Sequence, residues 1–500
     1  MHLTDMKPLT RQLTVLLLIV MLAWMTGCST NNGNGGQETP QGTNGGSTDA
    51  ASTTKPEASD SGVYPENGLP KDEKVTLKFG FFEGGMGREY IDYAMDTFKQ
   101  KFPNVSFEVV YSPKIGDIIN AKISANNDDD MFDLFNGNIP GGITPLVLSG
   151  KLEPQEDLWD SELYDASGKT LRDIALPGTV EAAIGKVGDH LYALPVSGSG
   201  SGLFFNKALF EEHGWDQNPK TWTAFLELLA DIKAEGIIPI TYPGKYPSYI
   251  EHAFGPIKMF ELAEANGNLE KFTDDYRNYK LPQHLAPESV DLWNRIYALA
   301  QKGYFPEGVA ALTHTQSQMQ MIQGQAAMVS TGVYVENEMK SALPPEFSWG
   351  YMSVPMSEDP DQTRWIRSTA SNGHYIWAGK PDLNKQWAKA FNVWMWNLDV
   401  QEVIAEKGGQ LPVRSDFSED PARADKLQKA PKAMLDYMAA NKSKMERGNR
   451  DQTLTDPSVS QAFKLMQEGT IEITSAKKEP LPILEEAEKL IGQAIEAQQK

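Results

Sequence analysis

Apolar residues that alternate, then recur at helical spacing, then alternate again constrain the fold of this chain most strongly. Residues 75–81 read Val-Thr-Leu-Lys-Phe-Gly-Phe, and residues 105–111 alternate in the same way, as half-buried strands do. Between them, four apolar residues recur at helical spacing: Ile91, Met95, Phe98 and Phe102. A strand–helix–strand order predicts a right-handed crossover and a largely parallel sheet. We therefore expect the folded part to begin near Lys74.

The same kind of pattern restarts downstream. Further strands are predicted at residues 132–135, 203–205, 237–242, 326–330 and 349–354, and helices at residues 222–232, 387–403 and 483–499. A chain of 500 residues is also too long for one ordinary core. Two βα-rich units in one chain predict an α/β protein with two lobes.

Charge and cysteine content exclude several functional classes. The formal net charge is −21, and so acidic a surface repels the phosphates of nucleic acid, which we do not expect as a partner. Cys28 is the single cysteine, so the chain forms no internal disulfide and no cysteine-based zinc site. The acidic run at residues 127–130 lacks the ligand spacing of a calcium loop. We expect no metal and no cofactor.

The N-terminus has the organisation of an export signal. Lys7 and Arg11 precede an apolar run at residues 13–25, which is short for a transmembrane helix. The run ends in Met25-Thr-Gly-Cys28, which resembles the bacterial lipobox, where the cysteine is lipidated. We expect residues 1–27 to be a signal peptide and Cys28 to anchor the protein to the extracytoplasmic face of the cell membrane. A signal peptide with an incidental cysteine is the alternative.

A polar segment follows the cysteine. Residues 29–62 contain no Val, Ile, Leu, Met or aromatic residue. Such a segment cannot bury enough apolar surface to offset its ordering entropy. We expect residues 28–73 to form a flexible tether.

Several segments in a fixed order resemble a known family. They include Gly202-Leu-Phe-Phe-Asn-Lys, Gly324-Gln-Ala-Ala-Met and Gly408-Gly-Gln-Leu-Pro-Val. Together they resemble the family 1 extracellular solute-binding proteins of the maltose-binding type. The resemblance implies a periplasmic-binding-protein-like fold of two α/β lobes joined by a hinge, with the ligand between them. It implies the substrate-binding subunit of an ABC importer, which takes a carbohydrate to transmembrane permease subunits.

The resemblance also implies boundaries and a subgroup. The first lobe would comprise residues 74–196 and 369–416, and the second lobe residues 197–367 and 417–500. Residues 240–250 and Tyr334-Val-Glu-Asn-Glu-Met resemble stretches of proteins that bind N-acetylglucosamine or chitobiose.

The candidates for sugar binding are polar and aromatic residues where predicted strands end, because ligands of open α/β sheets bind there. In the first lobe these are Glu83 and Arg88 after the first strand, and Asn136 and Asn138 after the strand at 132–135. The alternatives are a helix-start charge for Arg88 and turn chemistry around Gly137 for the asparagines. Polar groups at these positions would bond sugar hydroxyls.

The second lobe supplies the aromatic candidates. Tyr246 and Tyr249 lie in a loop broken by prolines, where aromatic residues are not part of a helix core. Tyr334 aligns with a tryptophan that stacks on sugar in the family, and Glu336 follows it. A buried sheet-edge aromatic is the alternative for Tyr334.

The two predicted hinge crossings add further candidates. Ser199 lies in a Gly- and Ser-rich stretch at residues 197–202. This stretch precedes the strand at 203–205, whereas a phosphate loop opens a helix, so we do not expect a phosphate loop here. Asn372 and His374 lie at the second crossing, although a lone histidine is more often structural. We expect Arg414 to reach the cleft. The alternative is a solvated surface charge.

A membrane-tethered glycan hydrolase is the rival function. It would need two facing carboxylates, for which Glu83 and Glu336 are the candidates, but no spacing brings them together. His-Glu-x-x-His and Gly-x-Ser-x-Gly are also missing from the chain. We therefore expect a binding protein rather than an enzyme.

Overall fold

The computed structural model describes residues 62–137, 139, 142–176, 179, 183, 185–188, 190–368 and 371–498, the side chains of residues 371 and 372 excepted. The predicted signal peptide, the lipidated Cys28 and most of the predicted tether lie outside the described residues, as does Asn138. Among the described residues, no helix has both the length and the apolar character needed to cross a bilayer.

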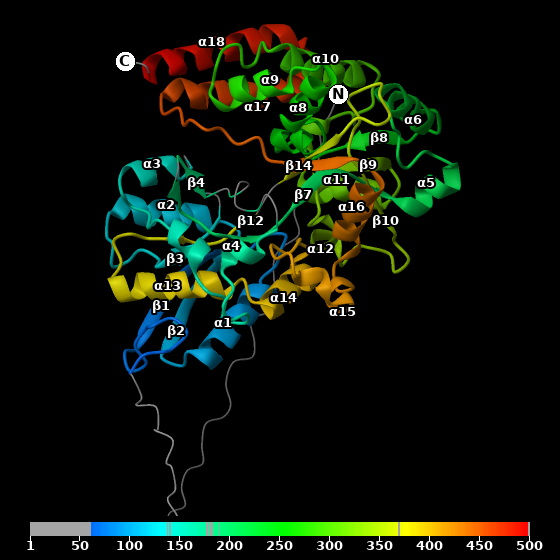
Figure 1. Cartoon of the computed structure of the whole chain (residues 1–500). Helices are drawn as coiled ribbons and strands as arrows, with labels where there is room; N and C mark the ends of the chain where they lie inside the picture. Colours follow the sequence, from blue (N-terminus) through cyan, green and yellow to red (C-terminus); the bar gives the residue numbers. More distant parts are fainter. Residues whose placement is uncertain are drawn as a thin grey trace, which may run out of the picture. The chain divides into compact units, whose positions relative to one another are not determined.

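The first sheet, which defines lobe 1, has the predicted strand–helix–strand unit. Strand β1 (Val75–Phe82) pairs in parallel with β2 (Val105–Ser112), and helix α1 (Glu89–Lys101) connects them. The strand order is β13-β3-β1-β2, in which β3 (Leu134–Phe135) is parallel and β13 (Tyr375–Ile376) antiparallel. Lobe 1 is the lower part of Figure 1. The prediction for residues 75–111 is confirmed.

Lobe 1 extends further toward the N-terminus than expected. Tyr64, which the sequence assigned to the tether, packs its ring 4.8 Å from that of Phe102 and 5.8 Å from that of Trp387. Leu69 is buried in the same core. Isolated apolar residues in a polar segment carry no periodicity, so their pattern does not indicate this packing.

The second sheet, which defines lobe 2, is mixed. Its order is β14-β11-β7-β9-β8, and β10 also pairs with β7. The strands are β7 (Gly200–Asn206), β8 (Ile238–Thr241), β9 (Ala326–Gly332), β10 (Trp349–Met352), β11 (Arg364–Ser368) and β14 (Ser443–Glu446). The predicted strands are present, but β7 runs antiparallel to β9, β10 and β11. The expectation of largely parallel pairing therefore holds for lobe 1 only.

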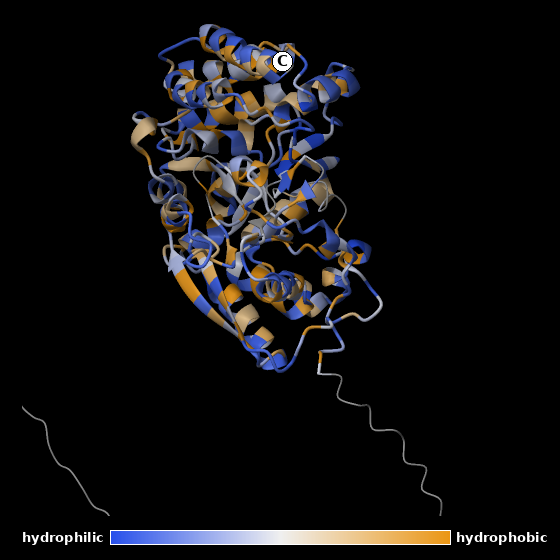
Figure 2. Ribbon diagram, turned by 90° about the vertical axis from the view of Figure 1, so that its left-hand side faces the viewer, coloured by the Kyte–Doolittle hydropathy of each residue, from blue (hydrophilic) through white to orange (hydrophobic). Residues whose placement is uncertain are grey.

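Helices cover both sheets, and in Figure 2 many of them carry one hydrophobic and one hydrophilic face. In lobe 1 they are α2 (Ile115–Ala125), α3 (Thr144–Leu148), α4 (Leu171–Ile174), α13 (Asp382–Trp394) and α14 (Leu398–Gly408). In lobe 2 they are α5 (Lys207–His213), α6 (Trp222–Ala234), α7 (Glu251–Phe254), α8 (Ile257–Ala265), α9 (Leu269–Arg277), α10 (Pro287–Gln301), α11 (His314–Ile322), α12 (Val335–Met339), α16 (Lys429–Ala440), α17 (Pro457–Thr474) and α18 (Pro480–Gln498). The short α15 (Pro421–Ala424) lies between α14 and α16.

The single long helix predicted at residues 387–403 is two helices. The chain turns between α13 and α14, and Trp396 in that turn is buried, with its indole Nε1 donating to the carbonyl oxygen of Pro195 at 2.9 Å. The apolar spacing continues through the turn because both helices pack on the same lobe. Periodicity alone does not reveal such a break.

Two crossings of the chain lie side by side between the lobes. Strand β6 (Pro195–Ser197) pairs with β12 (Ser371–Asn372), and Gly200 of β7 pairs with Ser368 of β11. The segment after α14 joins them, because Gly198 and Leu411 exchange backbone hydrogen bonds of 2.7 and 2.8 Å. This arrangement is the predicted hinge; the exact lobe boundaries stay a prediction.

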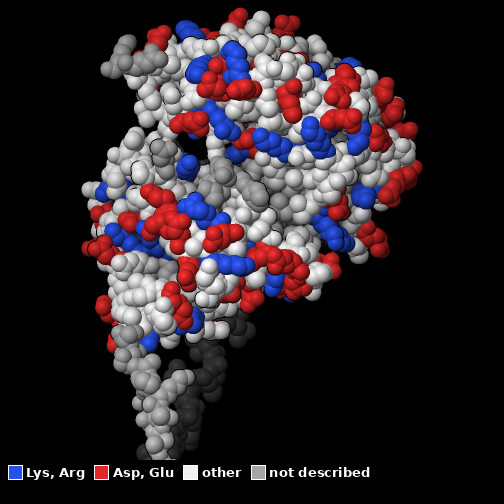
Figure 3. Space-filling view, viewed as in Figure 1, with Lys and Arg blue, Asp and Glu red and all other residues white. Residues whose placement is uncertain are grey.

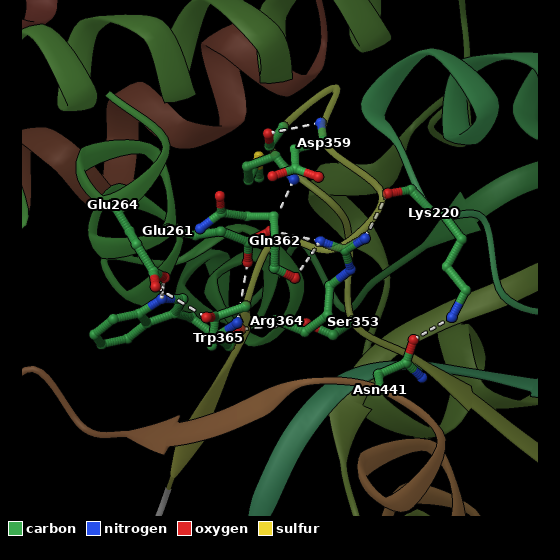
Figure 4. A network of polar contacts seen from close by, with 12 residues as sticks. Lys220, Glu261, Glu264, Ser353, Asp359, Gln362, Arg364, Trp365 and Asn441 are labelled. Carbon is green, nitrogen blue, oxygen red and sulfur yellow. Dashed lines mark hydrogen bonds and ion pairs between the residues drawn. The ribbon is translucent and has the colours of Figure 1, made fainter. Parts of the chain in front are cut away.

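A buried polar network fixes the strand that enters the hinge from lobe 2 (Figure 4). The Glu261 carboxylate on α8 pairs with Lys258 Nζ at 2.8 Å and lies 3.8 Å from the Arg364 guanidinium. It also accepts backbone N–H bonds from Met356 at 2.9 Å and Trp365 at 3.1 Å. The network therefore ties α8 to the start of β11.

Candidate functional site

Five ring side chains form one aromatic cluster in lobe 2: Tyr246, Tyr249, His252, His314 and Tyr334. Tyr246 stacks on His314 with 4.2 Å between ring centroids and 2° between planes. Tyr249 lies 4.4 Å from His314 and 4.7 Å from His252, and the Tyr334 hydroxyl donates to the Tyr249 hydroxyl at 3.4 Å. The structure thus brings together the three tyrosines that the sequence singled out, and adds two histidines that it did not.

Local sequence explains why these rings meet. Pro247 starts a short 3-10 helix, Pro247–Ile250, which sets Tyr246 and Tyr249 on one loop. Thr313 forms a capping box with Gln316 and starts α11, so that His314 is its first residue. A side chain at Gly332 would collide with the Tyr334 ring. Only glycine lets that ring fold back over the end of β9.

Burial favours the uncharged form of four of the five rings. Burial lowers the pKa of His252 well below its ordinary value and also lowers the pKa of His314. Burial raises the pKa of Tyr334 and of Tyr249. Tyr246 remains 42% exposed, so one face of the cluster is open to a ligand.

The loop after β1 brings lobe 1 close to the cluster. Asn337 of α12, the helix that Tyr334 precedes, donates from Nδ2 to the carbonyl oxygen of Gly85 at 2.5 Å. Glu83, earlier in the same loop, is exposed. Asn136 Oδ1 accepts from the backbone N–H of Phe82 at 2.7 Å, so its oxygen ties β3 to the end of β1. Glu83 and Asn136 are therefore located at the strand ends, as the sequence predicts.

Two charged candidates have structural partners instead. The Arg88 guanidinium pairs with Asp92 at 2.8 Å and lies 3.7 Å over the Tyr111 ring, so the helix-start alternative describes it better. The Glu336 carboxylate accepts from the backbone N–H of Ala430 at 2.6 Å, within the first turn of α16. It stabilises that helix N-terminus. Ligand binding by these two side chains stays a prediction.

Two further candidates lie inside lobe 1. His374 is 1% exposed, packs 4.7 Å from Phe79 and shares a 2.8 Å hydrogen bond with Asn392; burial lowers its pKa to about 4. Arg414 is also 1% exposed and pairs with Asp165 at 2.8 Å and Asp416 at 2.7 Å. His374 is a core residue, and Arg414 is neither a cleft residue nor a solvated charge.

The two remaining candidates at the hinge are Ser199 and Asn372. Ser199 is buried, and among the described residues its hydroxyl has no hydrogen-bond partner. Asn372 lies in β12, at the second crossing; its side chain is outside the description. Among the described residues, no group of three or more His, Cys, Asp or Glu side chains is arranged to hold a metal ion.

A cavity of about 810 Å³, here called the hinge cavity, lies between the lobes. Ser197, Ser368 and Val413 line it at the hinge, Lys186 from lobe 1, and residues 444–447 and 449–454 from lobe 2. Figure 3 shows a hollow between the lobes with Lys and Arg side chains at its margin. None of the predicted site residues whose side chains the structure describes lines the hinge cavity. The sequence signal that could have pointed to it is the pair Arg447 and Arg450 in the segment 447–451, which directly follows β14.

Two α/β lobes joined by side-by-side crossings, with ring side chains gathered near their junction, define the class of two-lobe binding proteins. The chain belongs to the bacterial extracellular solute-binding proteins, whose family model matches residues 84–402. Because it belongs to this extracellular family, the protein has an extracytoplasmic location.

Curated relatives are distant. The diacetylchitobiose binding protein NgcE of Streptomyces coelicolor is 24% identical over 286 residues, which cover 57% of this chain and 58% of the relative. The chain therefore spans less than two thirds of that relative's length. The sn-glycerol-3-phosphate-binding periplasmic protein UgpB of Brucella abortus is 23% identical over 354 residues, covering 69% of this chain and 76% of the relative.

Solved structures share the fold. A chitin oligosaccharide binding protein matches with a TM-score of 0.62 at 19% identity, covering 84% of this chain and 99% of that chain. The likeness confirms the predicted two-lobe α/β fold.

Proposed function

We propose that this protein is the extracytoplasmic substrate-binding subunit of an ABC importer, and that it captures a mono- or oligosaccharide between its lobes for transmembrane permease subunits. The observation that carries the proposal is the aromatic cluster, which three separate segments of lobe 2 form next to the Gly85 loop of lobe 1. Ring faces pack on the apolar faces of sugars, while hydroxyls and neutral imidazoles bond sugar hydroxyls.

In this proposal Tyr246 and Tyr334 stack on sugar rings, and Tyr249 orients Tyr334 through their hydroxyl contact. Glu83 and Asn136 supply polar groups from lobe 1. Ser199 and Asn372 would make further polar contacts with the sugar at the hinge. Asn138 would make one after the end of β3. Relatives named for diacetylchitobiose and chitin oligosaccharides support N-acetylglucosamine oligomers as the first ligands to test.

The rival function, a tethered glycan hydrolase, is not favoured. Its candidate carboxylate pair was Glu83 and Glu336. Because the Glu336 carboxylate bonds to the start of α16 at 2.6 Å, it is not free to face Glu83 across a substrate. A retaining or inverting mechanism needs two carboxylates at a defined separation on either side of the scissile bond.

A sugar panel tests the proposed function. The protein is mixed with N-acetylglucosamine oligomers, maltose, raffinose and glycerol 3-phosphate, and its thermal unfolding is followed. A ligand present at a hundred times its dissociation constant adds about 2.7 kcal/mol of stability, so at least one sugar should raise the midpoint clearly. Stabilisation by glycerol 3-phosphate alone would contradict the carbohydrate proposal.

We further propose that Cys28 carries the lipid anchor, with residues 1–27 removed as a signal peptide. The proposal rests on the single cysteine at the end of the apolar run. A diacyl anchor gives stable membrane attachment. In cells fed a fatty-acid probe, the natural protein should be labelled and Cys28→Ser should not. Equal labelling of both would refute the anchor.

A further inference from the structure

The last helix of the chain, α18, is bonded through one carboxylate to the loop between α9 and α10. Glu488 accepts from the backbone N–H groups of Gln283, His284 and Leu285 at 2.9, 2.5 and 3.0 Å. Bonds from N–H groups to a carboxylate are stronger than bonds between neutral groups. In Figure 1, α18 is the red helix at the top of lobe 2, beside α17 and α10. Glu488 therefore fixes the backbone of this loop from the side of lobe 2 that is remote from lobe 1.

The Gln283 side chain connects this loop with the segment that follows β14. Its Oε1 accepts from the Arg450 guanidinium at 2.6 Å, and its Nε2 donates to the carbonyl oxygen of Asp275 at 2.9 Å. Both ends of the amide are therefore bonded, which fixes its orientation. Residues 447–454 are here called the arginine segment. Gln283 links the loop that Glu488 holds to Arg450 in this segment.

The arginine segment has further contacts with the end of α9. The Arg450 guanidinium donates to the carbonyl oxygen of Tyr276, and it lies 3.5 Å from the Tyr276 ring centroid and 4.3 Å from that of Tyr279. The backbone N–H of Asp451 donates to the carbonyl oxygen of Arg277 at 2.9 Å. Ring contacts and carbonyl bonds orient a guanidinium without cancelling its charge. The position of Arg450 therefore depends on the end of α9 and on the loop that follows it.

This segment forms part of the wall of the hinge cavity. Arg450 and Leu454 line the cavity, whereas none of its described lining residues comes from α18. The cavity adjoins the aromatic cluster, because Arg367 neighbours both Arg447 and Tyr334. A side chain that contacts a ligand binds well only if the groups behind it hold its orientation. The carboxylate on α18 is such a group, because only the Gln283 residue separates it from Arg450.

We propose that Glu488 is a positioning residue for ligand binding, which acts from α18 through Gln283 on Arg450 without touching the ligand. The inference rests on the proposed function, in which a sugar is held between the lobes. An arginine that is already held in place presents its N–H donors to sugar hydroxyls at a smaller entropic cost than a mobile one. Loss of the Glu488 carboxylate should therefore weaken sugar binding, although no described residue of α18 lines the cavity.

Hydrogen exchange of the protein without ligand tests the positioning. In Glu488→Gln, whose single side-chain oxygen cannot replace both carboxylate oxygens, the amides of residues 283–285 and of the arginine segment should both exchange about fivefold faster or more. Glu486→Gln is the matched control on α18, because the Glu486 carboxylate is exposed and pairs with Lys489 at 3.7 Å; both rates should stay unchanged. Unchanged exchange of the arginine segment in Glu488→Gln, or equal acceleration in β1 of lobe 1, would overturn the proposal.

A double-mutant cycle tests the effect on binding, with whichever of N-acetylglucosamine oligomers, maltose and raffinose binds best. Glu488→Gln should weaken binding about fivefold in the natural protein and have no further effect in Arg450→Gln, because Glu488 acts through Arg450. Glu486→Gln should leave the affinity unchanged. An equal loss in both backgrounds would show that Glu488 acts elsewhere and would refute the proposal. If none of these sugars binds, the proposed function fails, whereas hydrogen exchange still decides whether Glu488 positions Arg450.

Discussion

Glu261→Gln is expected to destabilise the protein by about 3–5 kcal/mol, the range for breaking a buried ion pair. Glu261 is fully buried, and Lys258 and Arg364 beside it are 4% and 1% exposed. Glu261 accepts the backbone N–H bonds of Met356 and Trp365 on its two separate oxygens, and the single oxygen of glutamine could keep only one of them. The substitution would also leave two buried cations without the carboxylate that they share. Urea denaturation would measure the difference in unfolding free energy.

Glu264→Gln is the matched control, one helical turn further along α8. The Glu264 carboxylate accepts from Trp365 Nε1 at 2.6 Å and from the Thr363 hydroxyl at 2.9 Å. A glutamine can replace both bonds, because its oxygen can accept from Trp365 and its amide nitrogen can donate to the Thr363 hydroxyl. No buried cation depends on it, so its loss should stay below about 1.5 kcal/mol. If both variants lose the same stability, charge neutralisation in the buried network is not the cause.

The buried network also lies close to the hinge along β11. Trp365 and Arg364 begin β11, and Arg367 and Ser368 end it at the hinge. The buried anchor and the crossing therefore lie at the two ends of one five-residue strand. A strand fixed at its start lets the hinge bend at its end, rather than through the whole of lobe 2.

Tyr334→Ala is expected to weaken sugar binding about tenfold or more, because losing a stacked ring costs roughly 0.5–1.5 kcal/mol beyond the buried area. The Tyr334 hydroxyl also donates to the Tyr249 hydroxyl, so removing the side chain disturbs a second ring of the cluster. Calorimetric titration with the best sugar of the panel would measure the change.

Tyr334→Phe separates stacking from hydrogen bonding. It keeps the ring and loses only a long hydroxyl contact of 3.4 Å, so affinity should fall by no more than about threefold, which is under 1 kcal/mol. A tenfold loss in the phenylalanine variant would show that the hydroxyl, and not the ring face, contacts sugar. Unchanged affinity in Tyr334→Ala, with intact thermal unfolding, would remove Tyr334 from the site.

Local pattern predicted those parts of the fold that depend on neighbours in the sequence. The alternation at residues 75–81 and the helical spacing at 91–102 correspond to β1 and α1. Pairing direction in lobe 2 was not predictable in this way, because β7 pairs with β9, which lies more than a hundred residues later. The turn at Trp396 escaped detection for a related reason: its partner, Pro195, is far away in the chain.

The same limit explains why the structural partners of some predicted site residues were not foreseen. Tyr246, Tyr249 and Tyr334 are close together because each lies at the end of a strand or in the loop after it, which the sequence shows. Glu336 is occupied by Ala430, and Arg414 by Asp165. Such partners come from distant segments, so a polar residue next to a predicted strand end cannot be assigned to a ligand from its position alone.

The capture of a sugar between two moving lobes is tested most directly by small-angle X-ray scattering. The fragment should begin at Gly62, since Tyr64 and Leu69 pack on lobe 1. A ligand that contacts both the aromatic cluster and the loop at Glu83 favours the closed form, because the open form cannot make both sets of contacts. Saturation with the sugar identified by the panel should reduce the radius of gyration. An unchanged radius with a verified sugar would contradict capture by lobe closure.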